Sequence, residues 1–271
     1  MQADSDGLPR CTLDGRVAVI RLSQPSKRNA LDARALDALE RAIGEARDAA
    51  DRRVVDCVVL RGDGETFCSG FDLALCAEEP RRVEELLIGL SACVRALRMI
   101  DAPVVVRVQG AALAGGCALA VACDFVVVAD DAQLGYPVHR IGISPAVNIP
   151  ALLSRMGPAT RALLVSNELL DGRAAVERGL ATHSAPRESL DAEVEALVAR
   201  LLAKGPEALR ATKRLIRRIE ETGSGAIGPA RGIDDRAFAE TREASVALGG
   251  GDEFADMLRA FWAAKAAGRP R

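Results

Sequence analysis

The chain is poor in aromatic residues, which make up only 3% of its 271 positions. Proteins that bind single-stranded nucleic acid stack bases on aromatic side chains, so this class is disfavoured. The formal net charge is −2, which gives no general attraction to nucleic acid or to an anionic membrane. We therefore expect neither a nucleic-acid partner nor a membrane partner.

Histidine is scarcer still, with only His139 and His183 in the chain, and no C-x-x-C pair occurs. A zinc site is therefore disfavoured, and we expect no metal and no cofactor. The seven cysteines are odd in number, and several lie in apolar runs where a thiol acts as a small hydrophobic group. We interpret them as reduced, which predicts a cytoplasmic protein.

Long apolar runs are also missing. The most apolar stretch, residues 110–123, is followed by Asp124 and is too short to span a membrane, so we interpret it as buried core. The first ten residues lack a basic region followed by an apolar one, and we expect a loose leader there instead of a signal peptide. Hydrophobic residues at 49% and charged residues at 27% indicate a folded globular protein.

The hydrophobic pattern predicts an α/β core followed by helices. Alternating or β-branched runs predict strands at 17–22, 54–62, 104–110, 125–129 and 180–184. Helical spacing predicts helices after Asp32 and at 81–100, 147–156, 158–167, 172–179, 188–203, 206–220, 230–247 and 252–265. We place the core at residues 1–195 and a helical C-terminal region at residues 196–271.

Two glycine-rich loops each follow a predicted strand. The first is GDGETFCSGFDL at 62–73 and the second is VQGAALAGGCALAVACD at 108–124. Such loops expose backbone N–H groups, and two N–H groups that converge form an oxyanion hole. For either loop alone, an ordinary tight turn is the alternative. Neither loop has the sequence of a Walker A or dinucleotide-binding motif.

In this order, the two loops resemble the signatures of the crotonase (enoyl-CoA hydratase/isomerase) superfamily. The A-G-x-D-L type signature is matched by Cys68-Ser69-Gly70-Phe71-Asp72-Leu73. The G-x-x-x-G-G-G-x-E type signature is matched by Gly110 to Ala118, followed by Cys123-Asp124. The segment K-R-N-A-L at 27–31 resembles the family's loop near the phosphates of coenzyme A. The resemblance runs from about residue 12 to the end of the chain.

The resemblance implies a crotonase-like spiral of ββα units whose helical C-terminal region builds a homotrimer or a dimer of trimers. It implies an acyl-CoA substrate whose thioester oxygen is held by the N–H groups of Phe71 and Gly115. The substrate- or CoA-binding positions that it implies are Arg28, Ala30, Ser69, Gly70, Phe71, Asp72, Leu73, Gly115, Val138 and Lys265. For Lys265 a solvated surface charge is the alternative.

The sequence departs from the family where its hydratases carry two glutamates. Ala118 and Val138 occupy those positions, and neither side chain can transfer a proton. Two candidates lie nearby, His139 as an acid or base and Asn148. The alternatives are a surface or packing role for His139 and a helix cap before Pro150 for Asn148. Tyr136, Ser144, Ser91 and Cys117 are weaker candidates.

Three functions remain open from the sequence. The first is an enzyme that works through its oxyanion hole, as a decarboxylase, hydrolase or isomerase of acyl-CoA. Decarboxylation fits well because loss of CO₂ forms the enolate directly, without a protein base. The second is a catalytically silent acyl-CoA binding protein, and the third is a hydratase with an unusual water-activating group such as His139.

Overall fold

The structure, a computed structural model, describes residues 7–72, 82–222, 256 and 263. The chain divides into two compact units, residues 1–201 and residues 202–271. The boundary predicted after residue 195 falls inside helix α8, Leu190–Leu202. In the described residues, no helix has the length and apolar character that crossing a membrane requires.

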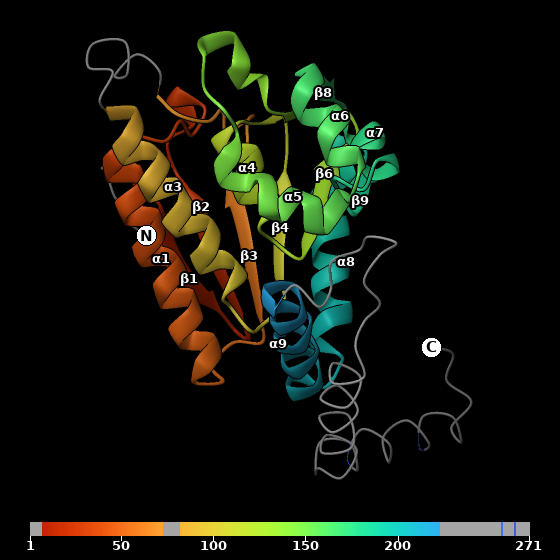
Figure 1. Ribbon diagram of the computed structural model, residues 1–271. Coiled ribbons are helices and arrows are strands. Elements are labelled where there is room, and N and C mark those ends of the chain that lie inside the picture. Colours follow the sequence, from red (N-terminus) through yellow and green to blue (C-terminus); the bar gives the residue numbers. More distant parts are fainter. Residues whose placement is uncertain (1–6, 73–81, 223–255, 257–262, 264–271) are drawn as a thin grey trace. The chain divides into compact units, whose positions relative to one another are not determined.

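A six-stranded sheet forms the centre of the first unit (Figure 1). The strand order is β1-β2-β3-β4-β6-β9; the β1–β2 pair is antiparallel and every other pair is parallel. The strands are β1 Arg10–Asp14, β2 Val17–Leu22, β3 Cys57–Gly62, β4 Val104–Val108, β6 Phe125–Ala129 and β9 His183–Ala185. Strands β3, β4 and β6 are nearly continuous apolar runs, as expected for parallel strands that are covered on both faces.

Two long helices, α1 (Ala33–Asp51) and α3 (Arg82–Arg98), lie side by side beside this sheet (Figure 1). Asp32 caps α1, because its carboxylate accepts a hydrogen bond from the Ala35 N–H at 2.7 Å. The buried face of α1 is rich in alanine, and these small side chains let the helix approach β1, β2 and α3 closely.

A second, three-stranded sheet carries the second glycine loop. Strand β5 (Ala111–Leu113) pairs in parallel with β7 (Gln133–Gly135), and β7 pairs antiparallel with β8 (Leu169–Leu170). Helix α4 (Gly115–Val121) begins two residues after β5, and all of its residues are buried. The start of α4 is therefore fixed by a strand on one side and by the protein core around it.

Short helices complete the first unit. They are η1 Pro25–Lys27, η2 Pro137–Ile141, η3 Ala146–Asn148, α5 Ile149–Met156, α6 Ala159–Ser166, α7 Gly172–Glu177 and η4 Arg187–Ser189, followed by α8. In the second unit, helix α9 spans Pro206–Thr222. Proline suits the first position of a helix because its missing N–H would have no partner there. The predicted helix at 230–247 lies outside the described residues, and of the predicted helix at 252–265 only residues 256 and 263 are described, both of them helical.

Two boundaries early in the chain differ from the prediction. The leader predicted at residues 1–10 overlaps the sheet at Arg10, where β1 begins, and β1 pairs with β2 across the two-residue turn Gly15-Arg16. Gly15 is the first of the two turn residues and has a φ of 54°, a conformation that glycine adopts readily in hairpin turns. Strand β3 starts at Cys57 instead of residue 54. Arg53, with a φ of 64°, turns the chain just before it.

Further along, β4 ends at Val108 and not at residue 110. The side chain of Gln109 donates hydrogen bonds to the carbonyl oxygens of Gly62 and Gly64, both at 2.8 Å. It thereby ties the end of β4 to the end of β3. Strand β5 lies in a segment predicted to be loop, and β9 occupies 183–185 where 180–184 was predicted.

Candidate active site

The two glycine-rich loops are joined by a short parallel bridge between Cys68 and Ala112. The Cys68 N–H donates to the Ala111 carbonyl oxygen at 3.0 Å, and the Leu113 N–H donates to the Cys68 carbonyl oxygen at 3.1 Å. At Gly116 a Cβ atom would lie 2.8 Å from the Cβ of Cys68. The loops therefore meet backbone to backbone, which requires a residue without a side chain at this position.

Asn29 holds the first loop from within. Its side chain is buried, and its Nδ2 donates to the carbonyl oxygens of Asp63, Thr66 and Phe67 at 2.9, 2.8 and 3.1 Å. Its Oδ1 accepts from the Gln24 N–H at 2.8 Å. No role for Asn29 was predicted from the sequence. Its backbone φ of 54° lies in the left-handed region, which asparagine tolerates better than most residues. An asparagine at this position was therefore the one feature of the sequence that could have indicated a tight turn here.

Two backbone N–H groups at the junction of the loops, those of Phe71 and Gly115, have no hydrogen-bond partner among the described residues. Phe71 pairs with Leu31 in an isolated parallel bridge. In this bridge Leu31 donates to the Gly70 oxygen at 2.8 Å and accepts from the Asp72 N–H at 3.0 Å. This pattern turns the Phe71 N–H away from Leu31. Gly115 is the first residue of α4, where an N–H has no partner within the helix.

The loops bring these two groups close together. A Cβ on Gly70 would lie 3.6 Å from the Gly115 nitrogen, and a Cβ on Gly115 would lie 3.6 Å from the Phe71 ring. Ala114, the residue directly before Gly115, adopts φ 49° and ψ −109°, a conformation that strains any residue with a side chain. Its N–H donates to the Gly135 carbonyl oxygen at 2.9 Å. The strain is localised at the point that sets the direction of the Gly115 N–H.

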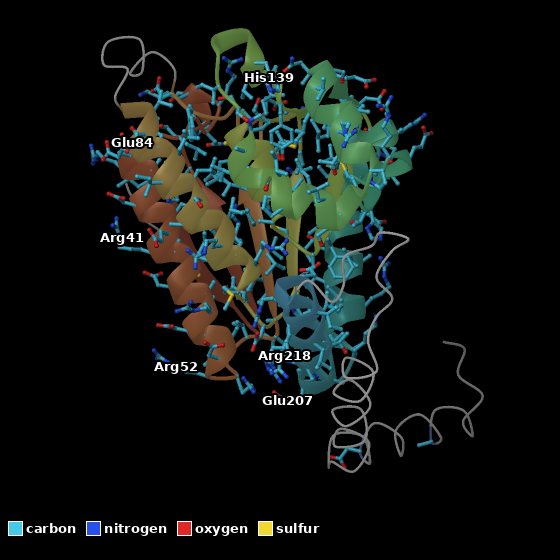
Figure 2. The ribbon with its side chains drawn as sticks, viewed as in Figure 1. Arg41, Arg52, Glu84, His139, Glu207 and Arg218 are labelled. Carbon is cyan, nitrogen blue, oxygen red and sulfur yellow. The ribbon has the colours of Figure 1, made fainter. Side chains whose placement is uncertain are left out.

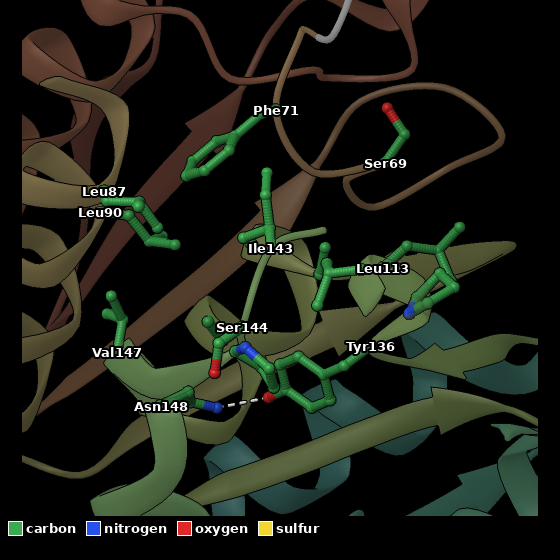
Figure 3. A pocket seen from close by; sticks show the side chains of 16 residues that line it. Ser69, Phe71, Leu87, Leu90, Leu113, Tyr136, Ile143, Ser144, Val147 and Asn148 are labelled. Atoms are coloured by element: carbon green, nitrogen blue, oxygen red, sulfur yellow. Dashed lines mark hydrogen bonds between the residues drawn. The ribbon is translucent and has the colours of Figure 1, made fainter. Parts of the chain in front are cut away.

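A cavity of about 240 Å³ is lined by Phe71 and Gly115 (Figure 3). Most of the remaining lining is apolar and comes from Leu87, Leu90, Leu113, Ala114, Ala118, Pro137, Val138, Ile143, Pro145 and Val147. Among the described lining residues there is no carboxylate, imidazole or cationic side chain. Ala118 and Val138, the positions where the resemblance places the hydratase glutamates, both face this cavity.

One side of the cavity is polar. Asn148 precedes α5, yet its side chain does not cap that helix; its Nδ2 donates instead to the Tyr136 hydroxyl (Figure 3). Tyr136 also shares a hydrogen bond with the Cys117 thiol. Burial raises the pKa of Tyr136 well above its usual range and raises the pKa of Cys117 to about 12. Both groups are therefore neutral near pH 7. This cluster was only partly foreseen, since the sequence offered its members as separate candidates.

The residues expected near coenzyme A lie around the first loop. Lys27 and Arg28 are exposed and Ala30 is half-buried. The Lys27 Nζ lies 3.1 Å from a carboxylate oxygen of Asp72, and the Arg28 carbonyl oxygen accepts from the Ser69 N–H at 3.1 Å. The basic segment is thus fastened to the loop that carries Phe71. Leu73 and Lys265, also predicted here, lie outside the described residues.

His139 is not brought into the cavity. It is exposed on η2 (Figure 2), and its Nδ1 lies 2.8 Å from the Oδ1 of Asn167. Its neighbour Val138 lines the cavity, so the two side chains diverge. Ser144 lines the cavity, whereas Ser91 on α3 does not. Of the two polar candidates named first from the sequence, the structure brings Asn148 alone to the cavity.

The model of the enoyl-CoA hydratase/isomerase family matches residues 12–263 of the chain. The chain belongs to this family. A Thermus thermophilus protein with the provisional name enoyl-CoA hydratase is 35% identical over 210 residues, covering 74% of this chain and 81% of its own. The short-chain-enoyl-CoA hydratase of Clostridium acetobutylicum is 28% identical over 233 residues, covering 84% and 86%.

Solved structures of family members share the fold. The enoyl-CoA hydratase of Mycobacterium smegmatis has a TM-score of 0.83 and 28% sequence identity, covering 97% of this chain and 98% of its own. The crotonase-like α/β fold predicted from the two loops is confirmed. The relatives reported above are named as enoyl-CoA hydratases, and the reaction of this chain is a separate question.

Proposed function

We propose that this protein binds an acyl-CoA thioester with the thioester oxygen between the N–H groups of Phe71 and Gly115. The observation that carries the proposal is that these two donors, unpaired among the described residues, meet at one cavity. Donors fixed in this way stabilise negative charge that develops on the oxygen, and one such donor typically contributes about 2.7–4 kcal/mol to catalysis. Family membership supports an acyl-CoA ligand.

The reaction that this geometry supports best is decarboxylation of a malonyl-type thioester. The bond to the carboxylate breaks, CO₂ leaves, and the electron pair moves into the thioester to form an enolate that the two N–H groups stabilise. A proton from solvent then completes the product. This route needs no protein base, in agreement with Ala118 and Val138 at the glutamate positions. Thioester hydrolysis and double-bond isomerisation are neighbouring reactions, but each needs a base or an activated water.

A second candidate is an acyl-CoA binding protein without turnover. The observation that favours it is the same apolar lining, which holds no acid or base among the described residues. The third candidate, a hydratase that uses His139, has less support, because that imidazole is exposed and paired with Asn167. We also propose, from the family resemblance, a homotrimer or dimer of trimers in the cytoplasm that uses no metal or redox cofactor.

A turnover screen tests the proposed chemistry. The full chain is mixed with methylmalonyl-CoA, crotonyl-CoA and several β-keto acyl-CoA esters, and the products are followed by mass spectrometry. Loss of CO₂ from methylmalonyl-CoA supports the decarboxylase, and release of free coenzyme A supports a hydrolase. Hydration of crotonyl-CoA would show that another group activates water. Binding of these esters without any turnover would favour the silent binder.

A matched pair of variants links activity to the oxyanion hole. In Gly115→Leu, the new Cβ would lie 3.3 Å from a methyl group of Leu31 and next to Phe71, so the side chain enters the cavity. In Gly44→Leu, on α1, the Cβ meets nothing within 4 Å. We expect Gly115→Leu to abolish turnover and Gly44→Leu to retain it. Equal activity in both variants would contradict the proposal.

A further inference from the structure

The side-chain carbonyl oxygen of Asn148 is buried and lacks a hydrogen-bond partner among the described residues. The side chain is 1% exposed, and its Oδ1 has no hydrogen-bond partner. Buried polar groups in folded proteins are nearly always paired, so an exception calls for an explanation. Asn148 occupies the position before α5 where an asparagine normally caps the helix, yet its side chain makes no such bond. The side chain is directed elsewhere, and the direction is toward the cavity that it lines.

The unsatisfied amide lies across the cavity from the oxyanion hole. In the close-up, Tyr136, Ser144 and Asn148 lie along one side, and Ser69 and Phe71 lie along the other (Figure 3). Apolar side chains such as Leu113 and Ile143 lie between the two sides (Figure 3). A thioester held at Phe71 would therefore extend its acyl group past apolar walls toward a polar end.

The polar end is neutral and can both donate and accept hydrogen bonds. Tyr136 and Cys117 keep their protons, because burial raises both pKa values. No cationic side chain lines the cavity among the described residues, so a carboxylate that stays bound at this polar end would be buried without a counter-charge, which is strongly unfavourable. The malonyl-type carboxylate of the proposed reaction differs, because it is carried on the carbon next to the thioester and leaves as CO₂. An alkyl chain would leave the Asn148 amide unpaired. A hydroxyl satisfies either end of an amide, because it is both a donor and an acceptor.

We propose that Asn148 and Tyr136 form a subsite that receives a hydroxyl group carried on the acyl chain of the thioester. This inference rests on the proposed function, because it assumes that an acyl-CoA ester occupies the cavity. It adds the class of substrate, a hydroxylated acyl group in preference to a plain alkyl one. A site built to pair a substrate hydroxyl discriminates strongly against the analogue that lacks it, since the polar group of the protein is then left unpaired.

Isothermal titration calorimetry with matched saturated esters tests the subsite. The full chain is titrated with butyryl-CoA and with its 2-, 3- and 4-hydroxy derivatives, which differ by one oxygen atom. We expect at least one hydroxylated ester to bind about tenfold more tightly than butyryl-CoA, or better. In Asn148→Leu we expect this preference to fall below about threefold, with butyryl-CoA bound as tightly as before or more tightly.

A second variant keeps the test informative if Asn148→Leu does not fold. Tyr136→Phe removes the hydroxyl that holds the amide, keeps the ring in the core, and should also weaken the preference. Gly44→Ala, at a position that meets no atom within 4 Å, should keep the full preference. Wild-type protein that binds all four esters equally would overturn the subsite while leaving acyl-CoA binding intact, and so would a preference that survives in both variants. Failure to bind any ester would overturn the proposed function as well.

Discussion

Gly116 lies directly against Cys68, so that a Cβ at position 116 would be 2.8 Å from the Cβ of Cys68. The contact is between the start of α4 and the loop that carries Phe71, and it includes backbone atoms on the Cys68 side. Backbone atoms in a paired bridge cannot move aside as the end of a flexible side chain can. The distance between the two unpaired N–H groups therefore depends on a position that has no side chain of its own.

The first prediction follows from this contact. Gly116→Ala should force the two loops apart, and we expect a loss of roughly 2–4 kcal/mol in the free energy of unfolding, as for other overpacked or strained core sites. Acyl-CoA binding should weaken as well. Gly44→Ala in α1 is the matched control and should stabilise the protein by about 0.5–1 kcal/mol. Urea denaturation measures both, and an unchanged Gly116→Ala protein would show that the loops can separate without cost.

Ala114 supplies a second prediction, of opposite sign. Its φ of 49° and ψ of −109° would be relaxed by glycine, so Ala114→Gly should raise the free energy of unfolding by about 1 kcal/mol after the entropy of glycine is counted. Ala196→Gly, on the exposed side of α8, has no strain to relieve and should lose about 1 kcal/mol. Thermal unfolding of the two variants checks the pair. A destabilised Ala114→Gly protein would argue that the local conformation is not strained.

Buried thiols should make the fold sensitive to alkaline pH. Cys68 and Cys117 are fully buried, and burial raises the pKa of each from 9.0 to about 12. The pKa of each thiol in the folded state lies above its value in the unfolded state. The contribution of each neutral, buried thiol to the free energy of unfolding is therefore complete below pH 9.0 and is lost as the pH rises to about 12.

The measurement is the free energy of unfolding in urea at about pH 8 and about pH 10. Each buried thiol should account for a fall of roughly 1 kcal/mol between these two pH values, because the unfolded chain ionises and the folded one does not. Cys117→Ala should show a correspondingly smaller fall than the wild-type protein. The same fall in both proteins would mean that Cys117 titrates normally in the folded state.

A row of arginines gives the fourth prediction. Arg21, Arg61 and Arg107 are register partners across β2, β3 and β4. Asp191 binds Arg107 through two hydrogen bonds of 2.7 and 3.0 Å and lies 3.4 Å from Arg61. Like charges on neighbouring strands repel, and Asp191 offsets this repulsion. The pKa of Arg61 is lowered, first by burial and then by Arg21.

Asp191→Asn should therefore lower the free energy of unfolding by roughly 1 kcal/mol, a modest amount because the carboxylate is partly exposed. The loss should shrink at about 1 M salt, where charge interactions are screened. Asp48→Asn removes an exposed pair with Arg52 at 3.8 Å and should change stability little. A loss for Asp191→Asn that is unaffected by salt would point to packing and not to charge.

The sequence predicted the architecture well where the pattern was local. Strands β2 and β6 and helix α1 were predicted from their own residues, and the two loop motifs led to the family. The short strands β5, β7 and β8 could not be predicted in this way, because two or three residues carry no periodicity. Their pairing arises from contacts between distant segments, such as Cys68 with Ala112.

The site was predictable in its backbone and only partly in its side chains. The glycine-rich loops indicated a close approach of two backbone segments with free N–H groups, and the family resemblance then singled out Phe71 and Gly115. Whether His139 or Asn148 faces the cavity depends on how η2 and η3 turn. A shift of one residue in either turn would exchange a side chain that faces the cavity for one that faces away from it. The contacts of Tyr136 with Asn148 and Cys117 join three separate segments, so no local pattern could reveal them.

Arg155 donates hydrogen bonds to the carbonyl oxygen of Val121, the last residue of α4, and to those of Cys123 and Asp124 just beyond it, so this helix is anchored at the end opposite Gly115. A backbone N–H group survives every substitution except proline, whereas an acid or base disappears with a single codon change. Substitutions can therefore remove an acid or base at positions such as Ala118 and Val138, or introduce one, while the backbone N–H groups stay in place. If the proposed function holds, the fold separates backbone donors that most substitutions leave intact from reactive side chains that a single substitution removes, and a new reaction can then arise at a site that already stabilises an anion.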